Sequence, residues 1–140
     1  MELNYDCFRD VLLTLESVLE VRSGGAGRFG DPNALSFSRA DLDMLLKLPR
    51  LSKYDRGQLF YALHNLNQAG YITANIDITD GIIMHCIVGD ITFNGHMFLK
   101  NIRDDNIWKK TMSLLSTVGS ASLPIIVKIA SNLICTQLGI

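Results

Sequence analysis

The side chains best suited to chemistry do not gather into one recognisable site. The three histidines, His64, His85 and His96, fall in three separate predicted elements. Neither a Gly-x-Ser-x-Gly nucleophile motif nor a phosphate-binding loop pattern occurs. Asp104 and Asp105 are adjacent, so their carboxylates diverge on a helix and suit a capping role better than metal binding. We therefore expect a protein without enzymatic activity, cofactor or small-molecule substrate.

The cysteines give no sign of a disulfide framework or a metal site. Cys7, Cys86 and Cys135 are odd in number and far apart, and no Cys-x-x-Cys pair occurs. The first ten residues carry acids where a secretory signal needs basic residues and then an apolar run. We expect a cytoplasmic protein with reduced thiols. The longest apolar run, 123–129, is interrupted by Lys128 and is too short for a membrane span, so we do not expect membrane insertion.

Length and composition indicate one compact domain, or one domain with a helical tail. The chain has 140 residues, of which 48% are apolar and 19% are charged. A chain of this size buries about two thirds of its unfolded surface, so it needs no metal or disulfide to stabilise a core. The apolar content also excludes wholesale disorder. A net charge of −1 gives no argument from bulk basicity for nucleic-acid binding.

Charge is unevenly distributed along the chain. Residues 22–56 hold seven basic residues against four acids, whereas residues 57–99 hold three acids and no Lys or Arg. Residues 1–21 are acidic, and residues 100–140 are mildly basic. This asymmetry suggests a binding face, although a mixed solvated surface would look much the same.

Apolar spacing predicts three helices before residue 70. Apolar residues recur every three or four positions over 3–20, between Ser38 and Pro49, and between Ser52 and Gly70. Ser38 and Ser52 each precede an aspartate by three residues, so they are the predicted N-caps. The glycine-rich segment 23–33 is predicted to be a mobile loop.

A β-hairpin and further helices are predicted after the third helix. Residues 71–78 alternate apolar and polar side chains, Asp80-Gly81 favours a tight turn, and 82–88 is the expected partner strand. Thr92 is expected to cap a helix whose apolar face consists of Phe93, Met97, Phe98 and Ile102. Asp104 and Asp105 favour the start of a helix over 106–118 that Gly119 closes, and Pro124 favours the start of a last helix that ends near Leu138.

Three helices followed by a hairpin predict a mainly α fold of the α+β type. The specific prediction is a winged helix-turn-helix with a two-stranded β-wing plus C-terminal helices. Residues 1–103 would form the winged-helix domain, and residues 104–140 would form a C-terminal helical extension. The third helix would be the recognition helix in the major groove of DNA.

The first functional hypothesis is regulatory binding of double-stranded DNA by a homo-oligomer. Basic and polar residues near the third helix can contact phosphates or base edges. The candidate DNA contacts are Arg39, Arg50, Lys53, Tyr54, Arg56 and Gln58. Nearby acids predict weak, salt-dependent binding by a monomer, so useful affinity would need a dimer or larger assembly.

The predicted wing speaks against DNA binding. Asn75, Asp77, Thr79 and Asp80 supply no cation, whereas a wing lying on a phosphate backbone gains from Lys or Arg. The alternative hypothesis is a protein-protein interaction module, which would use the acidic wing and the apolar tail as contact surfaces. Any amphipathic helix also has a polar outer stripe, so the third helix does not by itself separate the two hypotheses.

The run ITFNGHMFLKNIRDDNIWKKT, residues 91–111, resembles the signature of an uncharacterised family of small phage- and prophage-encoded winged-helix proteins. That signature has the form Leu-Thr-x-x-Gly-His-x-Phe-Leu followed by Ile-Arg-Asp-Asp-x-x-Trp. The segment from Leu66 to Ile72 is also similar to the family. The resemblance implies a winged-helix fold, a phage or bacterial setting and no assigned activity. The chain departs from the pattern at Phe93-Asn94 and in its glycine-rich insertion.

The last predicted helix is apolar on nearly all sides. A helix of this kind must be covered, and one at the end of a small monomer would leave part of its surface exposed. We therefore expect a homo-oligomer, most simply a dimer, formed through this helix. The candidate interface residues are Ile125, Ile126, Ile129, Leu133, Ile134 and Leu138. Complete burial within its own domain is the alternative, and a membrane-surface role is weaker because the helix lacks a basic face.

Overall fold

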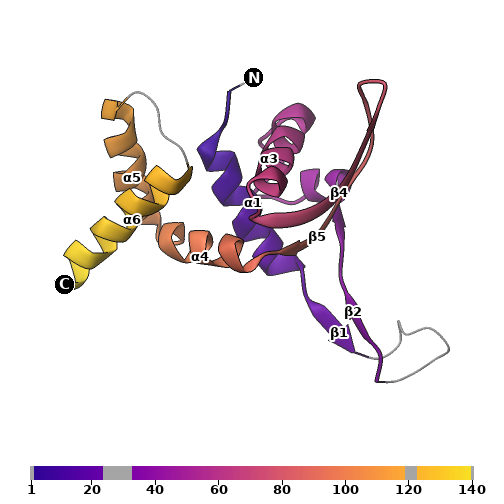
Figure 1. Ribbon diagram of the computed structural model, residues 1–140, viewed down its shortest axis with the longest axis horizontal. Helices are drawn as coiled ribbons and strands as arrows, with labels where there is room; N and C mark the ends of the chain where they lie inside the picture. The colour runs from indigo at the N-terminus through magenta and orange to yellow at the C-terminus, as the bar shows by residue number, and fades with distance from the viewer. Residues whose placement is uncertain (1, 24–32, 119–122, 140) are drawn as a thin grey trace. The chain divides into compact units, whose positions relative to one another are not determined.

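The protein is described here by a computed structural model, which covers residues 2–23, 33–118 and 123–139. The chain divides into two compact units, Met1–Gly95 and His96–Ile140, with the boundary inside helix α4 (Phe93–Ile102). The described residues form six helices, a three-stranded antiparallel sheet and a separate two-stranded pairing (Figure 1). The predicted α+β class is therefore confirmed.

Three helices build the core of the first unit. They are α1 (Tyr5–Val18), α2 (Leu42–Leu46) and α3 (Arg56–Gln68). α1 packs on α3, and α2 also contacts α3. Their apolar stripes are fully buried, with Leu12, Leu45 and Leu63 each at 0% exposure. Burial of this stripe is the main stabilising contribution to a short helix, because isolated helices of this length are marginal in water.

The sheet has the strand order β3-β5-β4, with β5 in the centre. Its strands are β3 (Ala40–Asp41), β4 (Ile72–Thr79) and β5 (Ile82–Ile91). β4 and β5 form the predicted hairpin, and the turn residues Asp80 and Gly81 have φ values of 52° and 77°, which suit a tight hairpin turn. β3 pairs with β5 at only two positions, Ala40 with Val88 and Asp41 with Ile87.

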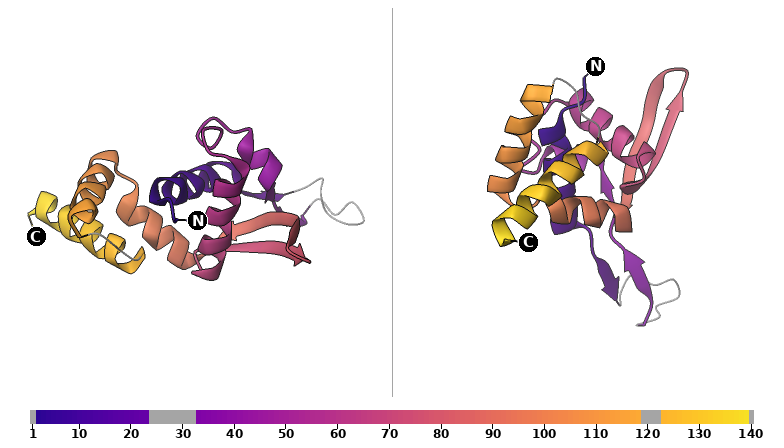
Figure 2. Two further views of the ribbon diagram at one scale, coloured as in Figure 1. Left: turned by 90° about the horizontal axis from the view of Figure 1, so that it is seen from above. Right: turned by 60° about the vertical axis from the view of Figure 1, so that its left-hand side comes forward.

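Two irregularities in the β4–β5 register decide which side chains share a face. The pairing skips Gly89 and Met84, which are therefore bulge residues on β5. The helix-facing pairs are Ile72–Ile91, Ala74–Val88, Ile76–Cys86 and Ile78–Ile83, and the open face carries Thr73–Asp90, Asn75–Ile87, Asp77–His85 and Thr79–Ile82. Ile72 and Val88 are buried, whereas Ile78 is 48% exposed and Ile83 is 41% exposed. The end of the hairpin extends beyond the helices (Figure 2), and these exposed isoleucines lie in that part of β4 and β5.

The two predicted serine N-caps are wrong. Asp41 caps α2 by accepting a hydrogen bond from the Met44 amide, and Asp55 caps α3 in a capping box with Gln58. A carboxylate near the positive end of a helix is the stronger cap in each pair. The Ser38 hydroxyl instead accepts a hydrogen bond from the Glu20 amide, and residues 40–41 are extended in β3.

Strands β1 (Val21–Ser23), β2 (Leu35–Phe37) and β3 were not expected from the sequence. β1 and β2 pair antiparallel, with Val21 opposite Phe37. Strands of two or three residues are too short to show alternation, so periodicity could not find them. The predicted mobility of the glycine-rich segment concerns mainly residues 24–32, which lie outside the described residues.

Close packing holds the root of the β4–β5 hairpin to the start of α4. The Thr92 hydroxyl accepts a hydrogen bond from the Gly95 amide and donates one to the Gly70 carbonyl. A side-chain carbon at Gly95 would overlap the Tyr71 carbonyl oxygen and lie 2.7 Å from Ile91 Cγ2. Thr92 therefore caps the helix as predicted, and Gly95 is required by the space available.

The second unit contains most of α4 with α5 (Asp105–Val118) and α6 (Leu123–Leu138), and α5 packs on α6. The carboxylate of Asp104 accepts a hydrogen bond from the Ile107 amide, so the expected capping of α5 is confirmed. On α4, Phe98 and Ile102 are buried, but Phe93 is 75% exposed. Met97 is also exposed, so the expectation that all four residues share the buried face is wrong: Phe93 and Met97, four residues apart, lie on a different side of the helix from Phe98 and Ile102. Gly119, the expected end of α5, lies outside the described residues.

Candidate functional site

Asp10 on α1 binds three of the six residues that were predicted to contact DNA. Its Oδ2 accepts a hydrogen bond of 2.6 Å from the Tyr54 hydroxyl and lies 3.0 Å from Lys53 Nζ, and its Oδ1 lies 3.5 Å from an Arg50 guanidinium nitrogen. The Asp10 side chain is only 10% exposed, whereas those of Arg50 and Lys53 are about half exposed. A carboxylate withdrawn from water is costly unless it is paired. This group, named the Asp10 cluster, ties α1 to the connection between α2 and α3.

The pKa values of two neutral side chains in or beside the Asp10 cluster are raised. Burial raises the pKa of the Tyr54 hydroxyl far above its ordinary value, and the hydrogen bond to Asp10 acts in the same direction. Burial and the charge of Asp10 raise the pKa of the nearby Cys7 thiol to about 12. Tyr54 is therefore a neutral hydrogen-bond donor over the physiological range, and Lys53 lies 5.3 Å from the centre of its ring.

Two further predicted contacts, Arg56 and Gln58, are engaged within the first turn of α3. The Arg56 guanidinium forms an ion pair with the Asp43 carboxylate on α2, and both side chains are exposed. Gln58 Oε1 accepts a hydrogen bond from the Asp55 amide, while Asp55 Oδ1 accepts one from the Gln58 amide. These contacts hold the two helices in register, and they reduce the positive potential at the N-terminal end of α3.

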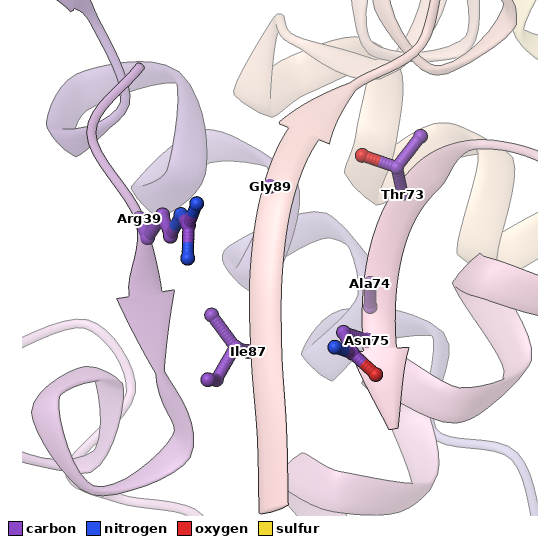
Figure 3. A pocket seen from close by; sticks show the side chains of 6 residues that line it. All are labelled: Arg39, Thr73, Ala74, Asn75, Ile87 and Gly89. Carbon is purple, nitrogen blue, oxygen red and sulfur yellow. The ribbon is translucent and has the colours of Figure 1, made fainter. Parts of the chain in front are cut away.

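Arg39, the sixth predicted contact, lies on the open face of the sheet, away from α3. It lines a shallow hollow of about 370 Å³ together with Thr73, Asn75, Ile87 and Gly89 (Figure 3). The bulge residue Gly89 lines the hollow and has no side chain to fill it. The structure thus distributes the six residues among three local environments instead of placing them along one helix.

The distal part of the β4–β5 hairpin differs from these polar clusters. Four large apolar residues, Ile78, Ile82, Ile83 and Met84, are between 41% and 64% exposed, and we name them the wing tip. No Lys or Arg occurs from Gly57 to Leu99. The first unit as a whole holds twelve acids and eight basic residues, a net charge of −4. Such a surface combines exposed apolar area with negative charge.

The candidate interface residues on α6 differ widely in exposure. Ile126 is fully buried, so it belongs to the core of the second unit. Ile125 is 43% exposed and Leu138 is 67% exposed, while Ile129, Leu133 and Ile134 are partly exposed. The second unit holds five basic residues and two acids, a net charge of +3.

The histidines and cysteines lie in separate surroundings. His64 stacks on Phe60 with ring centres 5.8 Å apart, and His85 Nε2 lies 3.2 Å from Asn75 Oδ1. His96 is exposed on α4. Within residues 2–23, 33–118 and 123–139, no three His, Cys, Asp or Glu side chains are grouped closely enough to hold a metal ion. Burial raises the pKa of the Cys86 thiol to about 11, which disfavours its reactive thiolate form.

Sequence analysis did not assign Asp10 or the wing tip to a site, although both left a signal. Asp10 is three residues after Cys7 and four before Thr14, and all three are buried on one stripe of α1. An acid on an apolar stripe needs a partner, which points to a buried cluster. The wing tip appeared in the sequence as an apolar run in which Ile82, Ile83 and Met84 are consecutive.

Comparison with known protein families places the chain in a family of hypothetical proteins, DUF2513. The match covers residues 2–122, which is most of the chain, so the protein belongs to this family. The match ends immediately before α6. Searches of curated proteins and of solved structures find no match. Among the described residues, no helix has both the length and the apolar character needed to cross a membrane.

Proposed function

We propose that the first unit is a winged helix that works as a protein-binding module without enzymatic activity. The order of α1, β3, α2, α3 and the β4–β5 hairpin supports the winged-helix assignment. The exposed wing tip, in a stretch without a single Lys or Arg, carries the functional proposal. A partner protein would cover this apolar surface, whereas a phosphate backbone would meet no Lys or Arg there.

The internal contacts of the predicted DNA-binding residues support the same choice. Arg50 and Lys53 compensate Asp10, and Arg56 compensates Asp43. A phosphate group would have to compete with these carboxylates for the same cations. The family resemblance points to a phage or bacterial protein as the partner.

Affinity capture with matched variants tests the proposal. The intact tagged protein should retain a bacterial or phage protein from a lysate after nuclease treatment, and Ile83→Glu with Met84→Glu should abolish that retention. Leu35→Glu serves as a matched control, because Leu35 is an exposed apolar residue on β2 and does not belong to the wing tip. Retention that is lost on nuclease treatment, or that is unchanged by the wing-tip variants, contradicts the proposal.

DNA binding is kept as a second candidate because of the side chains of Arg50, Lys53 and Arg56. Each is about half exposed or more, so each can contact a phosphate if its intramolecular partner releases it. Fluorescence anisotropy with a duplex at low salt tests this candidate. The expected result is weak binding that disappears at moderate salt, and the absence of binding by the folded protein would exclude it.

We also propose that the protein is a homo-oligomer, with a dimer as the simplest assembly. The exposed apolar residues Ile125 and Leu138 on α6 support this proposal. Light scattering should give the mass of an oligomer for the natural chain and the mass of a monomer for Ile125→Glu with Leu138→Glu. A monomer in both cases would overturn the assignment of α6 as an interface.

A further inference from the structure

The central strand of the sheet has an open edge. β4 pairs with β5 along the whole hairpin, but β3 covers the other edge only at Ile87 and Val88. After Asp41 the chain turns into α2 and leaves the sheet. Residues 82–86 of β5 therefore have no strand beside them on the β3 side within the described part of the chain. Alternate backbone amides and carbonyls on this edge are available to another strand.

This open edge lacks two of the usual features that prevent pairing with another chain, which are charged side chains and proline. Native proteins protect such edges with Lys, Pro, inward-pointing charges, β-bulges or an added covering element. Residues 82–89 of β5 include no charged residue and no proline. The bulge at Met84 is the single irregularity on this part of the strand, and it leaves Ile82, Ile83 and Met84 exposed.

A groove runs along the same edge. It has a volume of about 240 Å³ and is lined by residues 41–43, residues 83–87 and Arg56. A second hollow of about 200 Å³ is lined by Leu42, Gly57, Phe60, Ile83 and Arg56, so the two hollows share three lining residues. Gly57 has no side chain, and Leu42, Phe60 and Ile83 supply apolar walls. A strand added beside β5 would direct alternate side chains toward this second hollow, which suits an apolar side chain.

The charges around the groove indicate which residues should flank the apolar part of a bound segment. Arg56 forms an ion pair with Asp43, which leaves Asp41 as the further carboxylate that lines the groove, and residues 57–99, which include the whole hairpin, contain three acids and no Lys or Arg. An incoming segment with Lys or Arg next to its apolar residues is complementary to these carboxylates. A second copy of the first unit would bring the same negative charge, which disfavours a symmetric pairing of two copies.

We propose that β5 binds an extended, basic and apolar segment of a partner protein as an added strand, at the edge formed by residues 82–86. Backbone hydrogen bonds would hold the segment, and an apolar side chain in the hollow beside Phe60 would select it. This inference rests on the proposed protein-binding function and specifies its site and the chemistry of its partner.

The probe for this proposal is a labelled peptide of alternating valine and threonine with lysines at both ends. Fluorescence anisotropy with the intact protein should show saturable binding. Ile83→Glu should weaken binding at least tenfold, because Ile83 lines both hollows. Leu35→Glu is the matched control: Leu35 is an exposed apolar residue on β2 that lines neither hollow, and its substitution should change binding less than twofold.

Hydrogen exchange supplies a readout specific to strand addition. Bound peptide should slow the exchange of amides within residues 82–86 and leave those of α1 unchanged. A peptide flanked by glutamates should bind at least tenfold more weakly. Absence of binding, equal effects of Ile83→Glu and Leu35→Glu, or unchanged exchange at residues 82–86 would each overturn the proposal. A dimer in light scattering that Ile83→Glu dissolves would also overturn it, because the occupant would then be a second copy.

The peptide experiment and the lysate experiment test different claims, so their outcomes separate the failure of strand addition from the failure of the proposed function. If wing-tip variants abolish capture of a protein but exchange at residues 82–86 stays fast in the complex, strand addition is wrong and the protein-binding function stands. If capture does not depend on the wing tip, the proposed function itself is wrong.

Discussion

The Asp10 cluster and the wing tip both belong to the first unit, but they differ in whether their side chains are engaged within the chain. At the Asp10 cluster, polar groups that could face a ligand are bound to one another around a nearly buried carboxylate. At the wing tip, apolar side chains that could fill a core are left exposed. The comparison shows that residue type alone does not identify a binding surface. A surface available for binding is one whose side chains lack partners within the chain.

The largest expected effect concerns the root of the β4–β5 hairpin, where the backbone is closely packed against the start of α4. Gly95→Ala should lower the free energy of unfolding by at least about 3 kcal/mol, because the new carbon would overlap the Tyr71 carbonyl oxygen. Gly81→Ala at the hairpin turn should cost about 1–2 kcal/mol, since it is strained by a φ of +77° but meets no neighbour. Denaturant titration measures both. A smaller cost at Gly95 than at Gly81 would show that the root is not rigid.

The next effect concerns Asp10. Asp10→Ala should lower the free energy of unfolding by about 2–4 kcal/mol, because Tyr54 loses its acceptor and two cations lose their partner. Asp10→Asn keeps a hydrogen-bond acceptor and should cost less. It should also strengthen any binding of duplex DNA at low salt by releasing Arg50 and Lys53. If both variants are as stable as the natural protein, the Asp10 cluster does not stabilise the packing of α1 against the connection between α2 and α3.

Alkaline pH should weaken the cluster more gradually. The pKa of Cys7 is about 12 in the folded protein and about 9.0 when the thiol is in water, so the unfolded chain loses this proton first. The resulting stabilisation is present below pH 9 and is lost as the pH rises toward 12, by about 1–3 kcal/mol. Denaturation at a series of pH values measures the loss. Cys7→Ala should reduce the dependence of the free energy of unfolding on pH in this range. If the dependence does not change, other groups cause it, and Tyr54 is the first to test.

The smallest expected change in stability is at the wing tip. Ile82→Ser and Met84→Ser should each alter the free energy of unfolding by less than about 0.5 kcal/mol, because these side chains are 64% and 61% exposed. Capture of a partner should nevertheless fall. Thermal unfolding alongside the capture experiment tests this separation. A large loss of stability would mean that the wing tip is covered within the chain and does not form a free surface.

Most of the secondary structure could be predicted because it depends on local patterns. The amphipathic stripe of α1, the Asp80-Gly81 turn and the capping by Thr92 and Asp104 were all readable from nearby residues. β3 could not be predicted, since two residues form a strand only when β5 is already beside them. The cap of α2 was misplaced by three residues for the same reason, because pairing in β3 keeps the chain extended as far as Asp41.

The candidate site was less predictable than the fold. The sequence indicated basic and polar residues near α3, but the contacts of Arg50, Lys53 and Tyr54 depend on Asp10 of α1, which is forty or more residues away in the chain. No spacing rule links Asp10 to Tyr54. The open edge of β5 was likewise invisible, because it results from the point at which a separate strand stops.

Residue order alone was enough to establish the helical stripes, the hairpin, the caps within a few residues of their helices, and the shortage of cations on the wing. These properties depend on hydrogen bonding and burial patterns that repeat over a few residues. The chain's folding in three dimensions decided which charges neutralise one another and which apolar side chains stay uncovered. Both outcomes depend on distances between segments remote in the chain, since electrostatic pairing and burial act through space and not along the backbone.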